Sequence, residues 1–125
     1  MLVDTNALSA WADGEDSIVP HLSAPDMLFI PSVVLGEFYS GMQRSRHHQE
    51  YQSWLKKTLP AVKVANISHK TSQYYAKIRN DLKRMGKPIP ANDVWIAALA
   101  VQLCCPLLSN DRHFDSVPNL LRVSF

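Results

Sequence analysis

The 125-residue chain is 46% hydrophobic and 19% charged, with a formal net charge of +2. This length and composition suit one ordered domain over residues 1–125 and exclude two full domains or a disordered chain. The mild positive charge permits a polyanionic partner without indicating one. No signal sequence follows Met1, and the longest apolar stretch, residues 94–108, is shorter than the ~20 residues of a membrane helix. We therefore expect a cytoplasmic protein without membrane contact.

Short apolar runs alternate with longer helical patterns along the whole chain. Pro60 ends one helical pattern, Ser68 offers an N-cap for the next, and Gly86 follows the end of that one. Strands interleaved with helices predict an α/β fold with a mostly parallel sheet covered on both faces, because parallel neighbours need helical crossovers. The expected strands are residues 1–3, 27–30, 62–67, 106–108 and 120–123, and the expected helices are 7–12, 17–23, 33–45, 48–59, 70–85 and 92–104.

Four acidic residues stand near the starts of helices, and three of them come after expected strands. Asp4 follows the first strand, Glu37 lies in the helix after the second, Asp93 opens the sixth helix, and Asp111 follows the fourth strand. In a parallel sheet, ligand sites lie beyond the carboxyl ends of the strands. The order of elements therefore predicts that these four carboxylates meet at one edge of the sheet.

Each of these acids also has a structural explanation. Asp4, Asp93 and Asp111 are suitably placed to cap helices, where an aspartate is common and favoured by the helix dipole. Glu37 fits this explanation poorly, because its helix is mostly apolar and Gly41, not a basic residue, stands four positions later.

A group of carboxylates without basic partners needs a cation or protons to remain together. Oxygen ligands of this kind suit Mg²⁺, for which Mn²⁺ can substitute. Such a centre can acidify a water and offset the charge that develops on a phosphate, which is the chemistry of a phosphodiesterase.

Four segments resemble the PIN domain family, and within it the VapC-type ribonuclease toxins of type II toxin–antitoxin pairs. The resemblance covers the whole chain and rests on Val3-Asp4-Thr5-Asn6, on residues 31–37, on residues 92–98 and on residues 108–114. It implies a PIN-like three-layer α/β/α sandwich with about five strands. It also implies one PIN domain over residues 1–125.

The resemblance implies a role for each residue of this chain that matches a site position of the family. Asp4 and Asp93 would be direct Mg²⁺ ligands, and Glu37 and Asp111 would complete the site directly or through water. Ser109 stands where threonine is more common, and its hydroxyl is retained. The supporting residues would be Thr5, Asn6, Asn92 and Ser109.

The resemblance further implies a homodimer and a cognate antitoxin whose tail enters the acidic site. An antitoxin arginine or lysine would pair with the carboxylates and displace the metal. Four aromatic residues are plausible partner contacts, although aromatic residues at helical spacing more often belong to a core. These are Trp11, Phe38, Tyr39 and Trp54.

Basic residues gather in the fifth expected helix and just after it, before the segment that leads to Asp93. They are candidates for contacts to an RNA backbone, where phosphate contacts give affinity without sequence information. For any single one of them, a solvated helix face is the commoner explanation. The five residues are Lys77, Arg79, Lys83, Arg84 and Lys87.

The other reactive side chains are weaker candidates for the site. Asp115 follows Asp111 by four positions and is a weak candidate for the site. His113 lies near the site, but a metal centre removes the need for a histidine base. Cys104 and Cys105 have no distant partner for a disulfide and are expected to be reduced core thiols.

These observations favour an Mg²⁺-dependent endoribonuclease that acts as the toxin of a toxin–antitoxin pair. Two alternatives stay open. A nuclease of the same fold could act on DNA, and a catalytically silent module could retain the acids for stability or for partner docking.

Overall fold

The computed structural model describes residues 1–24 and 26–125. It contains a five-stranded sheet in the order β3-β2-β1-β4-β5, and every neighbouring pair is parallel. This confirms the predicted α/β/α class, and the sheet has the predicted number of strands. The strands are β1 Leu2–Val3, β2 Phe29–Pro31, β3 Lys63–Ala65, β4 Leu107–Leu108 and β5 Arg122–Val123.

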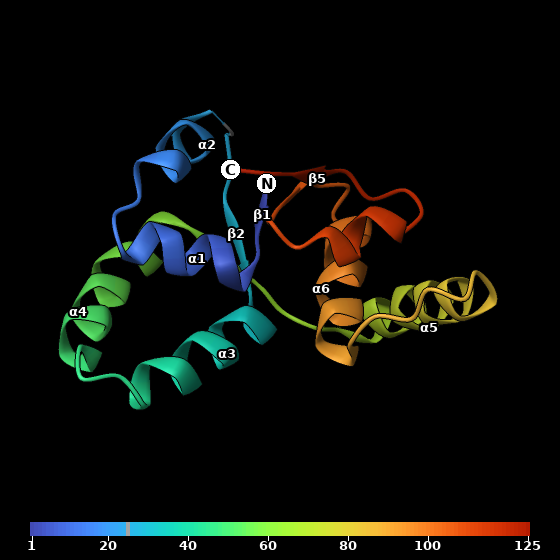
Figure 1. Cartoon of the computed structure of the whole chain (residues 1–125), viewed down its shortest axis with the longest axis horizontal. Coiled ribbons are helices and arrows are strands. Elements are labelled where there is room, and N and C mark those ends of the chain that lie inside the picture. The colour runs from blue at the N-terminus through green and yellow to red at the C-terminus, as the bar shows by residue number, and fades with distance from the viewer. Residues whose placement is uncertain (25) are drawn as a thin grey trace.

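Helices cover both faces of the sheet (Figure 1). In that view α1 and α4 lie on one side, α6 lies on the other with α5 beside it, and α3 lies near the edge where the strands end. The two chain ends lie at the opposite edge. The helices are α1 Thr5–Ala12, α2 Val19–Ser23, α3 Ser32–Gln43, α4 His48–Thr58, α5 His69–Arg84 and α6 Ala91–Gln102.

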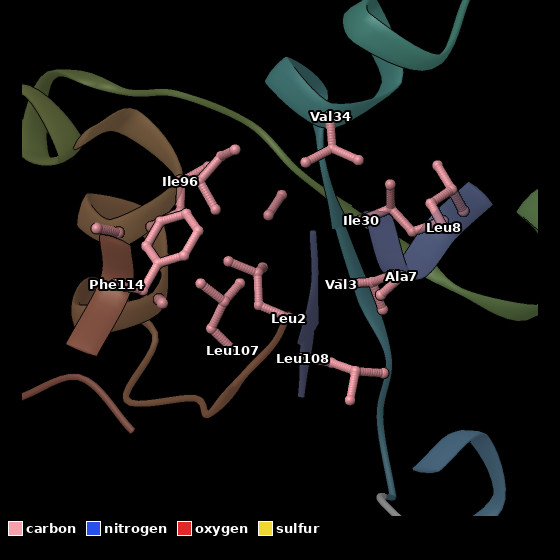
Figure 2. Packing of buried hydrophobic residues seen from close by; sticks show 14 of the residues in the cluster. Leu2, Val3, Ala7, Leu8, Ile30, Val34, Ile96, Leu107, Leu108 and Phe114 are labelled. Atoms are coloured by element: carbon pink, nitrogen blue, oxygen red, sulfur yellow. The ribbon is translucent and has the colours of Figure 1, made fainter. Parts of the chain in front are cut away.

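The core follows from the alternation of side chains along the strands. Leu2 and Leu107 point toward Ile96 and Phe114 on the α6 side, whereas the next residue of each strand points to the α1 side (Figure 2). Leu2, Leu107 and Phe114 are fully buried. Because both faces are apolar, even the two-residue strands β1 and β4 are held firmly in the middle of the sheet.

Local signals set several helix ends. The Ser68 hydroxyl accepts a hydrogen bond from the amide of Thr71, whose side chain in turn accepts from the Ser68 amide. This reciprocal pair is a capping box, and it confirms the predicted start of α5. Gly86 follows α5 with a φ of 68°, a conformation that glycine adopts without strain.

Two expectations need correction. The strand expected at residues 62–67 is shorter, because Asn66 and Ile67 are exposed and lead directly to the Ser68 cap. Cys104 is exposed, with a φ of 52°, so it is not a core thiol. It lies just after α6 ends, where the chain reverses into β4, and this turn carries the side chain to the surface.

The aromatic residues considered as partner contacts pack largely on one another. Trp11 meets Trp54 edge to face at 5.4 Å, and Phe38 lies 6.0 Å from Trp54, measured between ring centres. They join α1, α3 and α4 into one layer. Tyr39 remains 39% exposed.

No helix in the described part of the chain is both long enough and apolar enough to cross a membrane.

Candidate active site

The sheet brings Asp4 and Asp111 to the same edge. Val3 is paired with Leu108 across β1 and β4, so the residues that follow these two strands emerge side by side. Glu37 comes from the second turn of α3, which begins directly after β2, and Asp93 comes from the first turn of α6. We call Asp4, Glu37, Asp93 and Asp111 the acid cluster.

Asp4 is the most deeply placed of the four, with 4% of its surface exposed. Its Oδ2 accepts hydrogen bonds from Ser109 Oγ at 2.6 Å and from Asn6 Nδ2 at 3.1 Å. The Ser109 hydroxyl also accepts from the Asp111 amide at 3.0 Å. Ser109, itself fully buried, therefore ties the first acid to the backbone of the fourth.

Asn6 holds the same loop from the other side. Its amide group donates to Ser109 Oγ at 3.2 Å, and its Oδ1 accepts from the Asn110 amide at 3.1 Å. The predicted supporting residues Asn6 and Ser109 thus contact Asp4 directly. Their bonds fix the Asp4 carboxylate in one orientation.

Glu37 is held by the other two predicted supporting residues. Thr5 Oγ1 donates to its Oε2 at 3.0 Å, and Asn92 Nδ2 donates to its Oε1 at 3.4 Å. Thr5 follows Asp4 in sequence and Asn92 precedes Asp93, so these bonds link three members of the acid cluster. A hollow of about 640 Å³ opens beside Glu37 and is also lined by Thr5, Asn92 and Arg44.

Asp93, Asp111 and His113 form the outer part of the site. His113 Nδ1 lies 3.2 Å from Asp111 Oδ1 and 3.7 Å from Asp93 Oδ2. One ligand atom from each of the three residues lies within 4.8 Å of the others, close enough to share one metal ion. His113 is 58% exposed.

The carboxylates of the acid cluster act on one another through their charges. Burial raises the pKa of Asp4, and the charges of Glu37 and Asp111 raise it further. Burial, followed by the charges of Asp4, Asp111 and Glu37, raises the pKa of Asp93 from 3.8 to about 6. Folding therefore places mutually repelling carboxylates around one site.

The capping explanation holds for one acid of the three. Asp111 accepts a hydrogen bond from the His113 amide at 2.9 Å and so caps the short 3₁₀ helix Arg112–Ser116. Asp4 precedes α1, but its side chain makes no capping hydrogen bond. Asp93 lies inside the first turn of α6, beyond the capping position.

Asp115, the weak candidate, is bound elsewhere. Its two carboxylate oxygens accept from Arg122 Nε at 2.6 Å and from Arg122 Nη2 at 3.1 Å. This guanidinium lowers the pKa of Asp115. Arg122 also donates to the Ser109 carbonyl at 3.0 Å, so the pair braces the loop behind the acid cluster.

Three residues near the acid cluster received no site role from the sequence. His113 was recognised as nearby, and its spacing of two from Asp111 could have indicated the contact. Arg44 stands seven positions after Glu37, directly after the end of α3. Arg122 lies in β5, and no local pattern connects it with Ser109.

The five basic residues of α5 and the following turn divide into separate groups. Lys77 Nζ lies 3.2 Å from Asp81 Oδ2, and Arg84 also pairs with Asp81. Arg79 and Lys83 instead line a groove between α5 and the start of α6. Lys87 is exposed in the turn after α5.

The donor set of the acid cluster fits a hard divalent cation. It consists of carboxylate oxygens, and no lysine or arginine nitrogen of residues 1–24 or 26–125 lies within 4.0 Å of these four carboxylates. A bound cation would relieve the repulsion that raises the pKa of Asp93. The histidine is a further candidate ligand, although Mg²⁺ prefers oxygen.

A three-layer α/β/α fold with acidic residues near the carboxyl ends of its parallel strands is the arrangement expected from the resemblance to the PIN domain family. The sequence profile of the PIN domain matches residues 1–120. The chain belongs to the PIN domain family.

Named relatives refine the comparison. Ribonuclease VapC2 from Rickettsia felis is 29% identical over 125 residues, covering 96% of this chain and 93% of the relative. Ribonuclease VapC1 from Haemophilus influenzae strain R2866 is 26% identical over 124 residues, covering 95% and 92%. The chain thus spans nearly the full length of both relatives.

Solved structures with the same fold cover nearly the whole chain. A crystal structure of VapBC2 from Rickettsia felis, bound to a DNA fragment from the promoter of the pair, superposes with a TM-score of 0.90 at 27% identity, covering 99% of this chain and 97% of the other. DNA-bound VapBC from Salmonella typhimurium superposes with a TM-score of 0.87 at 20% identity, covering 98% and 96%. This second likeness supports the fold alone.

Proposed function

We propose that this protein is a divalent-metal-dependent endoribonuclease, the toxin of a type II toxin–antitoxin pair acting in the cytoplasm. The observation that carries the proposal is the acid cluster, in which four carboxylates meet without a lysine or arginine partner among the described residues. The similarity to two proteins named Ribonuclease VapC favours RNA as the substrate.

Asp4 and Asp93 would hold Mg²⁺ or Mn²⁺ directly, and Glu37 and Asp111 would hold it directly or through water. When bound, the cation would supply positive charge that acidifies a water and offsets the charge developing on the phosphate. Ser109 and Asn6 keep the Asp4 carboxylate oriented, and Thr5 and Asn92 do the same for Glu37. Hydrolysis joins the water oxygen to phosphorus and breaks the bond to a ribose oxygen, which leaves as a hydroxyl after taking a proton.

The test is cleavage of RNA by the purified chain with Mg²⁺, with Mn²⁺ and with EDTA. Asp4→Asn and Asp93→Asn should each abolish cleavage. Asp16→Asn, an exposed acid in the short 3₁₀ helix Asp16–Ile18, makes the same charge change and should retain it. Equal cleavage by all four proteins would identify a contaminating nuclease and refute the proposal.

The same series of experiments tests the two alternatives, a DNA nuclease and a catalytically silent module. Single-stranded DNA of the same sequence should be cut far more slowly than RNA, and preferential DNA cleavage would overturn the assignment to RNA. Calorimetry should detect Mg²⁺ or Mn²⁺ binding that Asp93→Asn removes. Absence of binding together with absence of cleavage would indicate a silent partner-binding module.

The antitoxin is expected to insert a basic side chain into the acid cluster, where it would pair with the same carboxylates as the metal. The similarity to the structure named VapBC2 from Rickettsia felis supports a protein partner here. Co-expression with the product of the neighbouring reading frame should inhibit cleavage. We further propose a homodimer, which light scattering at several protein concentrations will test.

A further inference from the structure

The cations of α5 differ in what surrounds them. Asp81 pairs with both Lys77 and Arg84, one turn to either side of it on the same helical face. The single carboxylate of Asp81 therefore offsets one of these two positive charges. Arg79 and Lys83 lie one turn apart on another face and line a groove, and neither has a carboxylate within 4.0 Å among residues 1–24 and 26–125.

This groove has a volume of about 360 Å³ and lies between α5 and the start of α6. We call it the basic groove. Most of its lining residues are apolar, and two cations of α5 form its charged wall. The lining residues are Arg79, Leu82, Lys83, Pro88, Ile89, Ala91 and Val94.

Arg79 is held in place on this wall. Its Nη1 donates to the Tyr75 hydroxyl at 2.6 Å, and its guanidinium carbon lies 5.8 Å from the centre of the Tyr75 ring. Tyr75 in turn stacks on Trp95 of α6, with 4.0 Å between ring centres. The guanidinium is therefore fixed relative to α6, although Arg79 is exposed.

The basic groove and the acid cluster share the first turn of α6. Ala91 and Val94 line the groove, whereas Asn92 bonds Glu37 and Asp93 belongs to the acid cluster. The two sites are thus separated by roughly the diameter of one helix, about 10 Å. A chain bound at the acid cluster would reach the groove by passing around this turn.

We infer that the basic groove binds the phosphodiester backbone of a single-stranded RNA whose scissile phosphate lies at the acid cluster. The inference rests on the proposed ribonuclease function. Charge complementarity selects the occupant, because a polyanion must approach four carboxylates and gains affinity from uncompensated cations beside them. Of the five basic residues considered from sequence, Arg79 and Lys83 provide this contact, and Lys77 and Arg84 do not.

The chain offers a closely matched pair of variants. Arg79→Gln with Lys83→Gln removes one arginine and one lysine from the groove, and Lys77→Gln with Arg84→Gln removes the same two residue types from the Asp81 face. Binding of labelled single-stranded RNA is measured in EDTA, where no cleavage occurs, as a function of salt concentration. The groove variant should bind about tenfold more weakly and lose about 1.4 from the slope of log affinity against log salt. The control should stay close to wild type.

Cleavage separates a binding role from a structural one. In Mg²⁺ the groove variant should raise KM about tenfold and leave kcat nearly unchanged for a long RNA. A short oligonucleotide that reaches only the acid cluster should show no such rise. Lys83→Gln alone keeps the Arg79–Tyr75 bond and should show part of the rise in KM. Arg79→Lys with Lys83→Arg keeps both positive charges and should have a KM close to that of wild type.

The outcomes distinguish the inference from the proposed function. If wild type cleaves no RNA, the proposed function fails. If wild type cleaves RNA but the two double variants behave alike, the basic groove does not bind RNA and the inference fails alone. A change of oligomeric state in the groove variant, with RNA affinity unchanged, would assign the groove to a second copy of the chain and would also overturn it.

Discussion

Replacing Asp93 with Asn removes one negative charge from the acid cluster while keeping the shape of the side chain. In the metal-free protein the pKa of Asp93 is raised from 3.8 to about 6, mainly by burial and then by the charge of Asp4. This difference corresponds to at most roughly 3 kcal/mol of unfavourable free energy in the folded, ionised state. The side chain is 18% exposed, so solvent screening reduces the expected value to about 1–2 kcal/mol.

The sign of the pH dependence follows from proton binding. The native protein binds the Asp93 proton more tightly than the unfolded chain does, so stability falls as pH rises from about 4 to about 6. In EDTA at pH 7.5, Asp93→Asn should therefore raise the free energy of unfolding by about 1–2 kcal/mol. Near pH 3 the two proteins should be nearly equal, because Asp93 is then largely protonated in both the folded and the unfolded state.

Urea unfolding with a circular dichroism signal measures these differences, with Asp16→Asn as the control for an exposed acid. Saturating Mg²⁺ should reverse the order, since an ion at about 100 times its Kd adds about 2.7 kcal/mol to the protein that binds it. Wild type gains this stabilisation and Asp93→Asn loses a ligand. If Asp93→Asn is less stable than wild type in EDTA across the whole pH range, the electrostatic reasoning is refuted.

Three further predictions concern the support of the site and the core. Ser109→Ala removes the donor to Asp4 Oδ2 and should lower the free energy of unfolding by about 1–3 kcal/mol, measured in urea, and remove most of the cleavage rate. Ser109→Thr keeps the hydroxyl and should retain both the stability and the rate. Equal losses in the two variants would exclude the hydroxyl as the cause. Arg122→Gln frees the Ser109 carbonyl and should cost about 1 kcal/mol with a several-fold lower cleavage rate, and a wild-type rate would show that this brace is dispensable. Phe114→Ala empties a fully buried position and should cost about 3–5 kcal/mol, against little for the exposed Leu121→Ala; a small loss at Phe114 would contradict the packing described for α6.

The order and type of the elements were predictable because they depend on local pattern. Alternating apolar runs and helical periods indicate a parallel sheet, and Ser68 marks the start of α5 through hydrogen bonds within three residues. The grouping of the four acids was also predictable. For Asp4, Glu37 and Asp111 it requires only that each come after a strand of the same parallel sheet. Asp93 opens α6, which follows another helix, and its signal in the sequence was the resemblance of residues 92–98 to the PIN domain family.

The partners of individual side chains were not predictable in the same way. Asp115 has a helical spacing from Asp111, yet it pairs with Arg122 from a strand that follows later. His113 meets Asp93, twenty positions earlier, and its contact depends on how the loop after β4 lies against α6. Cys104 lies in an apolar stretch of sequence, yet it is exposed because the chain turns sharply there.

The sequence by itself determined the parallel sheet, the sides of the helices that pack on it, and the edge where Asp4, Glu37, Asp93 and Asp111 meet. These depend on hydrophobic period and on element order, which are properties of the chain read in one dimension. Only the tertiary structure decided which cations of α5 remain uncompensated and how Ser109 and Asn6 orient Asp4. Hydrogen bonds and ion pairs act over a few ångströms, so they depend on which side chains the fold brings within that reach.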